Sequence, residues 1–112
     1  MGIEPSPERV KFLQAWAQCE GGTARYNPLN TTFHLPGATR YNSVGVQNYE
    51  DHMQGLAGTL ATIRLPYYSD LRKALAQKGL SAAEIARRSR ASIATWGTDP
   101  GCVVARAGGH AA

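Results

Sequence analysis

Residues 16–22 read WAQCEGG, and this stretch sets the end of the first predicted helix. The helix is predicted to begin at Ser6-Pro7, because serine caps a helix N-terminus and proline suits its first turn. The two glycines end it, since glycine adopts the left-handed geometry of a helix C-terminus. Residues at i, i+3, i+4 and i+7 share one helical face, and here they are Leu13, Trp16, Ala17 and Glu20. Glu20 is therefore predicted in the last turn, on the buried side.

An acid at this position is placed where its charge is disfavoured. An apolar neighbourhood disfavours a carboxylate, and the negative C-terminal pole of the helix repels it. Both effects favour the protonated form that a general acid needs. A structural role is the alternative: Glu20 pairs with an arginine such as Arg25 or Arg40, or turns to solvent at the helix end.

Residues 23–49 lack helical periodicity and are rich in Asn, Thr, Gly and Pro. Thr31 to Leu35 and Tyr41 to Val46 are predicted as two short strands around a Pro36-Gly37 turn. A connection of this length with so little regular structure often carries function, because a scaffold can present side chains from it. We therefore expect binding residues in this segment.

Three more helices are predicted after this loop. Asn48 is expected to cap the first of them, with Asp51 reaching back in a variant of the capping box. Its predicted inward face carries Met53, Leu56, Leu60 and Ile63, and the small residues Gly55, Ala57, Gly58 and Ala61 are expected to allow close packing. Leu65-Pro66 interrupts the pattern, and a helix from about Tyr68 to Gln77 is predicted to bury Leu71, Ala74 and Leu75.

The last predicted helix starts at a capping box formed by Ser81 and Glu84 and ends at Trp96-Gly97. Its predicted inward residues are Ile85, Ala86 and Ile93. The sequence thus predicts a mainly α fold (α+β) with a small β-hairpin, as one domain over residues 1–98. Residues 99–112 are rich in Gly and Ala, and we expect this C-terminal tail to be partly disordered.

The chain has 112 residues and a net charge of +4, which suggests an anionic partner. Arg87, Arg88 and Arg90 form either a solvated basic face or a docking patch for an anionic polymer. No aromatic residue interleaves with them, so nucleic acid binding is the less favoured alternative. No stretch approaches the roughly 20 apolar residues of a membrane span. The N-terminal MGIEPSPERV has no apolar segment, and we expect no signal peptide and synthesis in the cytoplasm.

Cys19 and Cys102 are the two cysteines of the chain. They can pair if the C-terminal segment folds back on the first helix, but an intracellular origin favours free thiols. The three histidines are scattered and no CxxC occurs, so we expect neither a metal site nor a cofactor. Cys19 with His52 is an alternative nucleophilic pair, as in a cysteine peptidase.

Four motifs follow one another in the first half of the chain: Glu20-Gly21-Gly22, the NPLNTT of residues 27–32, the YNSVGV of residues 41–46, and Asn48-Tyr49. A later tyrosine, Tyr67, fits the same pattern. In this order the motifs resemble the lysozyme-like superfamily, and in particular glucosaminidase-type and actinobacteriophage peptidoglycan hydrolases (endolysins). The resemblance covers roughly residues 10–97 and implies a lysozyme-like helical domain.

The resemblance implies that Glu20 is the catalytic acid. It also implies a substrate-binding role for Asn27, Asn30, Thr31, Tyr41, Ser43, Tyr49 and Tyr67. The residue types suit this role, because amides hydrogen-bond sugar hydroxyls and N-acetyl groups while tyrosine rings stack on sugars. The alternatives are turn formation for the asparagines and core packing for the tyrosines.

A second carboxylate is harder to assign, because no acid lies between Glu20 and Glu50. Glu50 and Asp51 are the nearest, and Asp51 is already predicted to cap a helix. Substrate assistance by an N-acetyl group, or chemistry like that of lytic transglycosylases, needs only one acid. We therefore expect single-acid cleavage of peptidoglycan glycan strands, acting after lysis, within a virion or as a module of a larger protein. A non-catalytic peptidoglycan-binding or virion structural module is the alternative.

Overall fold

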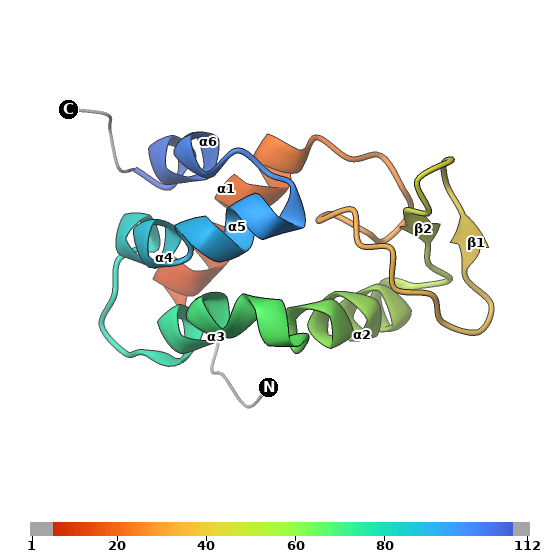
Figure 1. Cartoon of the computed structure of the whole chain (residues 1–112), viewed down its shortest axis with the longest axis horizontal. Coiled ribbons are helices and arrows are strands. Elements are labelled where there is room, and N and C mark those ends of the chain that lie inside the picture. Colours follow the sequence, from red (N-terminus) through yellow and green to blue (C-terminus); the bar gives the residue numbers. More distant parts are fainter. Residues whose placement is uncertain (1–5, 109–112) are drawn as a thin grey trace. The chain divides into compact units, whose positions relative to one another are not determined.

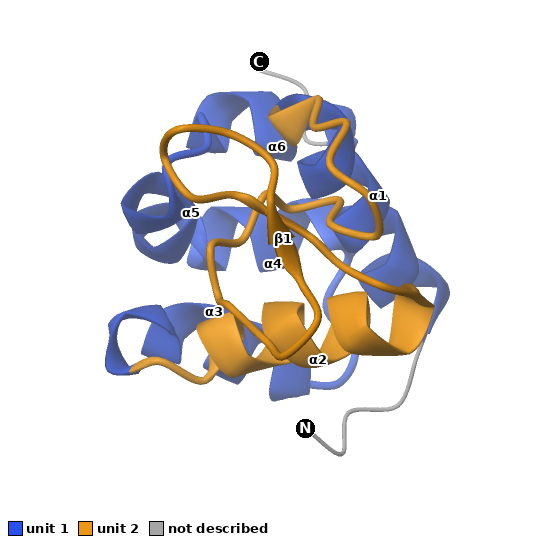
Figure 2. Cartoon of the chain, turned by 90° about the vertical axis from the view of Figure 1, so that its right-hand side faces the viewer, with its two compact units in different colours: residues 1–19, 66–112 blue, residues 20–65 orange. Residues whose placement is uncertain are grey.

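The computed structural model describes residues 6–108 and shows a mainly helical chain with a small antiparallel hairpin (Figure 1), which confirms the predicted fold class. The elements are α1 (Pro7–Glu20), β1 (Thr39–Arg40), β2 (Gln47–Asn48), α2 (His52–Ile63), the 3-10 helix η1 (Pro66–Tyr68), α3 (Ser69–Ala76), α4 (Ala82–Arg88), α5 (Arg90–Trp96) and α6 (Pro100–Arg106). The chain divides into two compact units (Figure 2). Unit 1 comprises residues 1–19 and 66–112, and unit 2 comprises residues 20–65.

Helix α1 has the bounds that the sequence predicts, because its end signals are local. The Ser6 hydroxyl accepts a hydrogen bond from the backbone N–H of Arg9 at 3.2 Å, as an N-cap does. After Glu20, Gly21 has φ +60°, the left-handed geometry that ends the helix.

The buried face of α1 differs from the predicted one. Phe12, Ala15 and Trp16 are buried, whereas Leu13 is 38% exposed. Together with the half-buried Cys19, these residues have the same i, i+3, i+4, i+7 spacing as the predicted set, so spacing alone does not separate the two faces. Partners within unit 1 decide between them, because Cys19, which belongs only to the observed set, is bonded to Cys102. Trp16 belongs to both sets, and its indole N–H donates to the Thr98 hydroxyl at 2.9 Å.

The core of unit 1 is built by short helices with apolar faces. Helix α3 buries Leu71, Ala74 and Leu75, as predicted. The predicted fourth helix is two helices, because the chain leaves helical geometry at Ser89, which has φ −97° and ψ 6°. Ser81 caps α4 through its hydroxyl, which accepts from the Glu84 N–H at 3.1 Å, as predicted.

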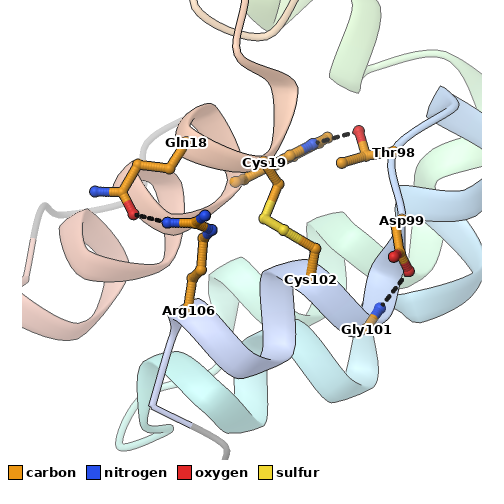
Figure 3. The surroundings of a disulfide bond; sticks show 8 residues. Gln18, Cys19, Thr98, Asp99, Gly101, Cys102 and Arg106 are labelled. Carbon is orange, nitrogen blue, oxygen red and sulfur yellow. Dashed lines mark hydrogen bonds between the residues drawn. A yellow bond between two sulfur atoms is a disulfide. The ribbon is translucent and has the colours of Figure 1, made fainter.

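The segment after Asp99 is not a disordered tail within the described residues. The Asp99 carboxylate accepts from the Gly101 N–H at 3.0 Å and caps α6, which buries Val103 and Val104. Cys102 on α6 forms a disulfide with Cys19 on α1, with Cα atoms 6.1 Å apart (Figure 3). The expectation of free thiols is therefore wrong, and the predicted boundary at residue 98 cuts through unit 1. Residues 109–112 lie outside the described part.

The hairpin of unit 2 is displaced from its predicted position. Strands β1 and β2 pair with Thr39 opposite Asn48 and Arg40 opposite Gln47. Residues 41–46, predicted as a strand, are the turn instead, and residues 31–35 are not a strand. The Asn42 carboxamide accepts from the Val46 N–H at 3.0 Å, and Gly45 has φ +91°, so both residues suit a turn.

Helix α2 starts later than predicted, and its buried face agrees with the prediction in part. Asp51 itself is the N-cap, because its carboxylate accepts from the Gln54 N–H at 2.8 Å. Met53 and Leu56 are 74% and 52% exposed, whereas two glycines and Ile63 are buried. A side chain at Gly55 would collide with the Tyr26 backbone, and one at Gly58 would collide with the Tyr49 ring. Ile63 is therefore buried as predicted, Met53 and Leu56 are not, and the close packing expected at Gly55 and Gly58 is confirmed.

Candidate active site

Glu20 is half-buried at the C-terminal end of α1, where unit 2 begins. Its Oε2 accepts a hydrogen bond from the Asn30 carboxamide Nδ2 at 2.9 Å. The structure thus brings together the predicted acid and one of its predicted binding residues. This bond fixes one carboxylate oxygen of Glu20 against a neutral amide of the loop that follows the helix.

The backbone holds Asn30 in an uncommon conformation. Its φ is +56°, a left-handed geometry that asparagine tolerates better than most residues. Its N–H donates to the carbonyl of Asn27 at 3.2 Å, which closes a tight turn. The turn therefore orients the Asn30 side chain.

Gly22 makes room for this side chain. A Cβ at Gly22 would lie 2.8 Å from the Asn30 Cγ and 2.9 Å from its Nδ2. Contacts this short displace the amide, so glycine at position 22 leaves the space that Asn30 uses in the observed bond to Glu20. The local sequence pattern assigns both glycines to helix termination and does not reveal this role. The available signal was the second glycine, because one is enough to end a helix.

Asn27 organises the loop and does not face a ligand. Its side chain is fully buried, and its Nδ2 donates to the carbonyls of Thr31 and Gln47, both at 2.8 Å. Its Oδ1 accepts from the Thr31 N–H at 2.9 Å. Since these bonds use both amide protons and the carbonyl, the turn-forming alternative describes Asn27 and the predicted sugar contact is wrong for this conformation.

Thr31 and Tyr49 are also buried inside unit 2, with exposed fractions of 2% and 1%. The Thr31 hydroxyl is hydrogen-bonded to that of Thr62, and the Tyr49 hydroxyl donates to the carbonyl of Phe33. Burial raises the pKa of Tyr49, and a hydrogen bond with the Thr31 side chain offsets part of the rise. Both residues thus pack the core of the unit, against the predicted substrate role.

Tyr41 and Ser43 remain accessible on the hairpin. Tyr41 is 45% exposed, and its hydroxyl shares a hydrogen bond with the Thr23 hydroxyl. Ser43 is exposed in the turn that follows. Thr23 is a residue that the sequence analysis missed, because nothing in its local pattern marks it. Tyr67 is 67% exposed on η1 and belongs to unit 1.

The two candidate second carboxylates have other contacts. Asp51 caps α2, and the carboxylate of Glu50 lies against Gly37, where a Cβ would collide with it. Within residues 6–108, no three His, Cys, Asp or Glu side chains gather as metal ligands. The disulfide removes the thiol that the cysteine peptidase alternative needs at Cys19.

Comparison of the chain with protein-family models, with characterised proteins and with solved structures finds no match. None of the helices over residues 6–108 has both the length and the apolar character needed to cross a membrane.

Proposed function

We propose that this protein cleaves the glycan strands of bacterial peptidoglycan, with Glu20 as a single general acid. The observation that carries the proposal is the half-buried Glu20 carboxyl at the end of α1, held by Asn30 at 2.9 Å. A positioned carboxyl of this kind can protonate the bridging oxygen of a glycosidic bond. The order of motifs around it, which resembles the lysozyme-like superfamily, supports the same role.

The geometry suggests how the proton is held. Because the Asn30 amide donates to Oε2, the protonated acid carries its proton on Oε1. Transfer of that proton to the bridging oxygen accompanies cleavage of the bond between this oxygen and the anomeric carbon. The electrons of that bond stay on the departing oxygen, and positive charge develops on the sugar. Glu20 becomes a carboxylate that the Asn30 N–H continues to stabilise.

The positive centre must then be captured without a protein carboxylate. Asp51 caps α2 and Glu50 lies against Gly37, so neither is assigned to this step. The substrate's own N-acetyl oxygen can form the new bond to the anomeric carbon, after which water opens the ring. Alternatively, a sugar hydroxyl attacks, gives its proton to Glu20 and leaves an anhydro product.

Substrate contacts are expected from the accessible part of the hairpin. The exposed ring of Tyr41 can stack on the apolar face of a sugar, and the Ser43 hydroxyl can bond its polar edge. Asn27, Thr31 and Tyr49 keep the loop in place behind them. In the proposed setting, the protein reaches the wall after phage-mediated lysis, within a virion or as a module of a larger protein.

The test is digestion of purified peptidoglycan, followed by mass spectrometry of the released fragments. We expect products from the wild type and a loss of roughly 100-fold or more for Glu20→Gln, since general acid catalysis contributes on this scale. Glu50→Gln removes the same charge in the same unit and should retain activity. Equal activity of Glu20→Gln and the wild type would overturn the mechanism, and the product masses identify the bond.

A non-catalytic peptidoglycan-binding or virion structural module is the second candidate. It is favoured by the burial of Asn27, Thr31 and Tyr49, which leaves fewer side chains free to surround a substrate. Retention of the protein on purified peptidoglycan, with no new reducing ends or anhydro sugars after prolonged incubation, would support it.

A further inference from the structure

A cavity of about 290 Å³ opens in unit 1, and its lining includes none of the residues assigned to the proposed activity. Ser6 and Arg9 line it from the start of α1. Gln77, Lys78 and Leu80 line it from the segment between α3 and α4, and Ile85 from α4 itself. The cavity thus combines two cations, a hydroxyl and an amide with an apolar wall, and its lining includes no acid.

Arg9 is half-buried at this site and is held by backbone carbonyls. Its Nε donates to the Leu75 carbonyl at 2.8 Å, and its Nη2 to the Gln77 carbonyl at 3.4 Å. These carbonyls lie at the C-terminal end of α3, where a positive charge offsets the negative pole of the helix. The guanidinium is therefore fixed in position before any ligand arrives.

Two further cations lie at the same place. Lys78 is exposed and lines the cavity, and Arg88 donates from Nη1 to the Gln77 carboxamide oxygen at 2.9 Å. Glu8 is an acid next to Arg9 in sequence, and its Oε1 accepts from the Ala82 N–H at 3.0 Å. Glu8 is thus directed to the first turn of α4, and the local charge around Gln77 is positive.

The charge of the whole unit adds to this local field. Unit 1 contains nine of the twelve Lys and Arg residues and five acids, whereas unit 2 contains three of each. The net charge of +4 therefore falls entirely on unit 1. The apolar side chains of Leu80 and Ile85 also lower the local dielectric, which strengthens the attraction between a bound anion and these cations.

We propose that this cavity binds a phosphate ester. The phosphate oxygens face Arg9, Lys78 and the Ser6 hydroxyl, whereas the carbon part of a small polyol faces Leu80 and Ile85. Several donors and more than one positive charge suit a phosphate better than a carboxylate, because phosphate presents more acceptor oxygens. Two sources carry this chemistry, a soluble polyol phosphate and a polymer of polyol phosphate units.

The test uses the full chain and three variants that each lower the net charge by one. Lys78→Gln removes a cation from the cavity wall, and Ser6→Asp adds an anion there while it keeps an N-cap residue on α1. Arg90→Gln is the matched control, because Arg90 on α5 does not line the cavity. Calorimetric titration at low salt measures the affinity for glycerol phosphate, and thermal unfolding confirms that each variant folds.

We expect glycerol phosphate to bind the wild type and to bind Lys78→Gln and Ser6→Asp about tenfold more weakly, as for the loss of one charge-assisted contact. Arg90→Gln should bind like the wild type. Titration with poly(glycerol phosphate) distinguishes the two sources. If the polymer binds more tightly per phosphate than glycerol phosphate, and the variants weaken it in the same way, the ligand is the polymer. If the two bind equally per phosphate, the ligand is the soluble ester.

Absence of binding to both ligands would overturn the proposal. An equal loss in all three variants would also overturn it, because net charge and not the cavity would then explain the affinity. Duplex DNA provides the last comparison, since DNA binding that Arg90→Gln weakens as much as Lys78→Gln would assign a general basic surface. None of these outcomes depends on Glu20. The phosphate-binding proposal can therefore be wrong while the proposed glycan cleavage is right, and the cleavage can be wrong while phosphate binding is right.

Discussion

The two units of this protein are held together by different interactions. Unit 1 packs apolar helix faces around Trp16 and carries the disulfide and all of the net charge. Unit 2 has one helix, a two-stranded hairpin and a long loop, and its order depends on side chain–backbone hydrogen bonds and close contacts at glycine. The comparison teaches that the candidate acid lies in the unit whose structure depends most on individual polar residues.

The largest expected effect tests the covalent link of unit 1. Replacement of both cysteines, Cys19→Ser with Cys102→Ser, should lower the free energy of unfolding by about 4 kcal/mol, since the bond closes a loop of 83 residues. Chemical denaturation measures it. Dithiothreitol should destabilise the wild type by a similar amount and leave the double variant unchanged. A wild type that is insensitive to the reductant would contradict the bond.

The next effect tests the hydrogen-bond network of unit 2. Asn27→Ala should lower the free energy of unfolding by about 3 kcal/mol, because it leaves the Thr31 N–H and two carbonyls without their buried hydrogen-bond partner. Asn42→Ala is the matched control, since it removes one bond in an exposed turn, and it should cost less than 1 kcal/mol by the same reasoning. If urea denaturation shows that both variants lose the same free energy of unfolding, the buried Asn27 amide contributes no more to stability than the exposed Asn42 amide.

A smaller effect compares a glycine from each unit. Gly58→Ala should destabilise by about 2 kcal/mol, because the new methyl group overlaps the Tyr49 ring. Gly101→Ala on α6 meets only the Asp99 carboxylate at 3.3 Å and should be neutral or slightly stabilising. Thermal unfolding measures both changes. A tolerated Gly58→Ala would show that α2 can move away from Tyr49 at little cost.

The smallest effect is a dependence of stability on alkaline pH. Burial raises the pKa of Tyr49 in unit 2 and that of Tyr68 in unit 1, where Tyr67 contributes further. Unfolded tyrosines ionise near pH 10, so this contribution to stability is fully present below pH 10 and is lost as the pH rises through the higher folded values.

Denaturation measured from pH 8 to 11 should therefore show a gradual decline. Tyr49→Phe and Tyr68→Phe should each remove part of the decline, and Tyr41→Phe on the exposed hairpin should remove none. A profile that is the same in all three variants would assign the pH dependence to other groups.

Local chemistry made part of the candidate site predictable. The resemblance of the motifs pointed to both Glu20 and Asn30, and the structure joins them by one hydrogen bond. The roles of Gly22 and Asn27 were missed, because each depends on an atom several residues away that sequence spacing does not reveal. Tyr49 was placed in the site because an exposed and a buried tyrosine look the same in sequence.

The sequence by itself determined both ends of α1 and the start of α4. The Ser6 and Ser81 caps, and the glycine after Glu20, act within three or four residues, so their effect needs no distant partner. The tertiary structure alone decided which of two equally spaced faces of α1 is buried, which face of α2 lies inward and whether the cysteines pair. These outcomes depend on residues tens of positions apart in the chain, and their burial is set by what folding brings into contact.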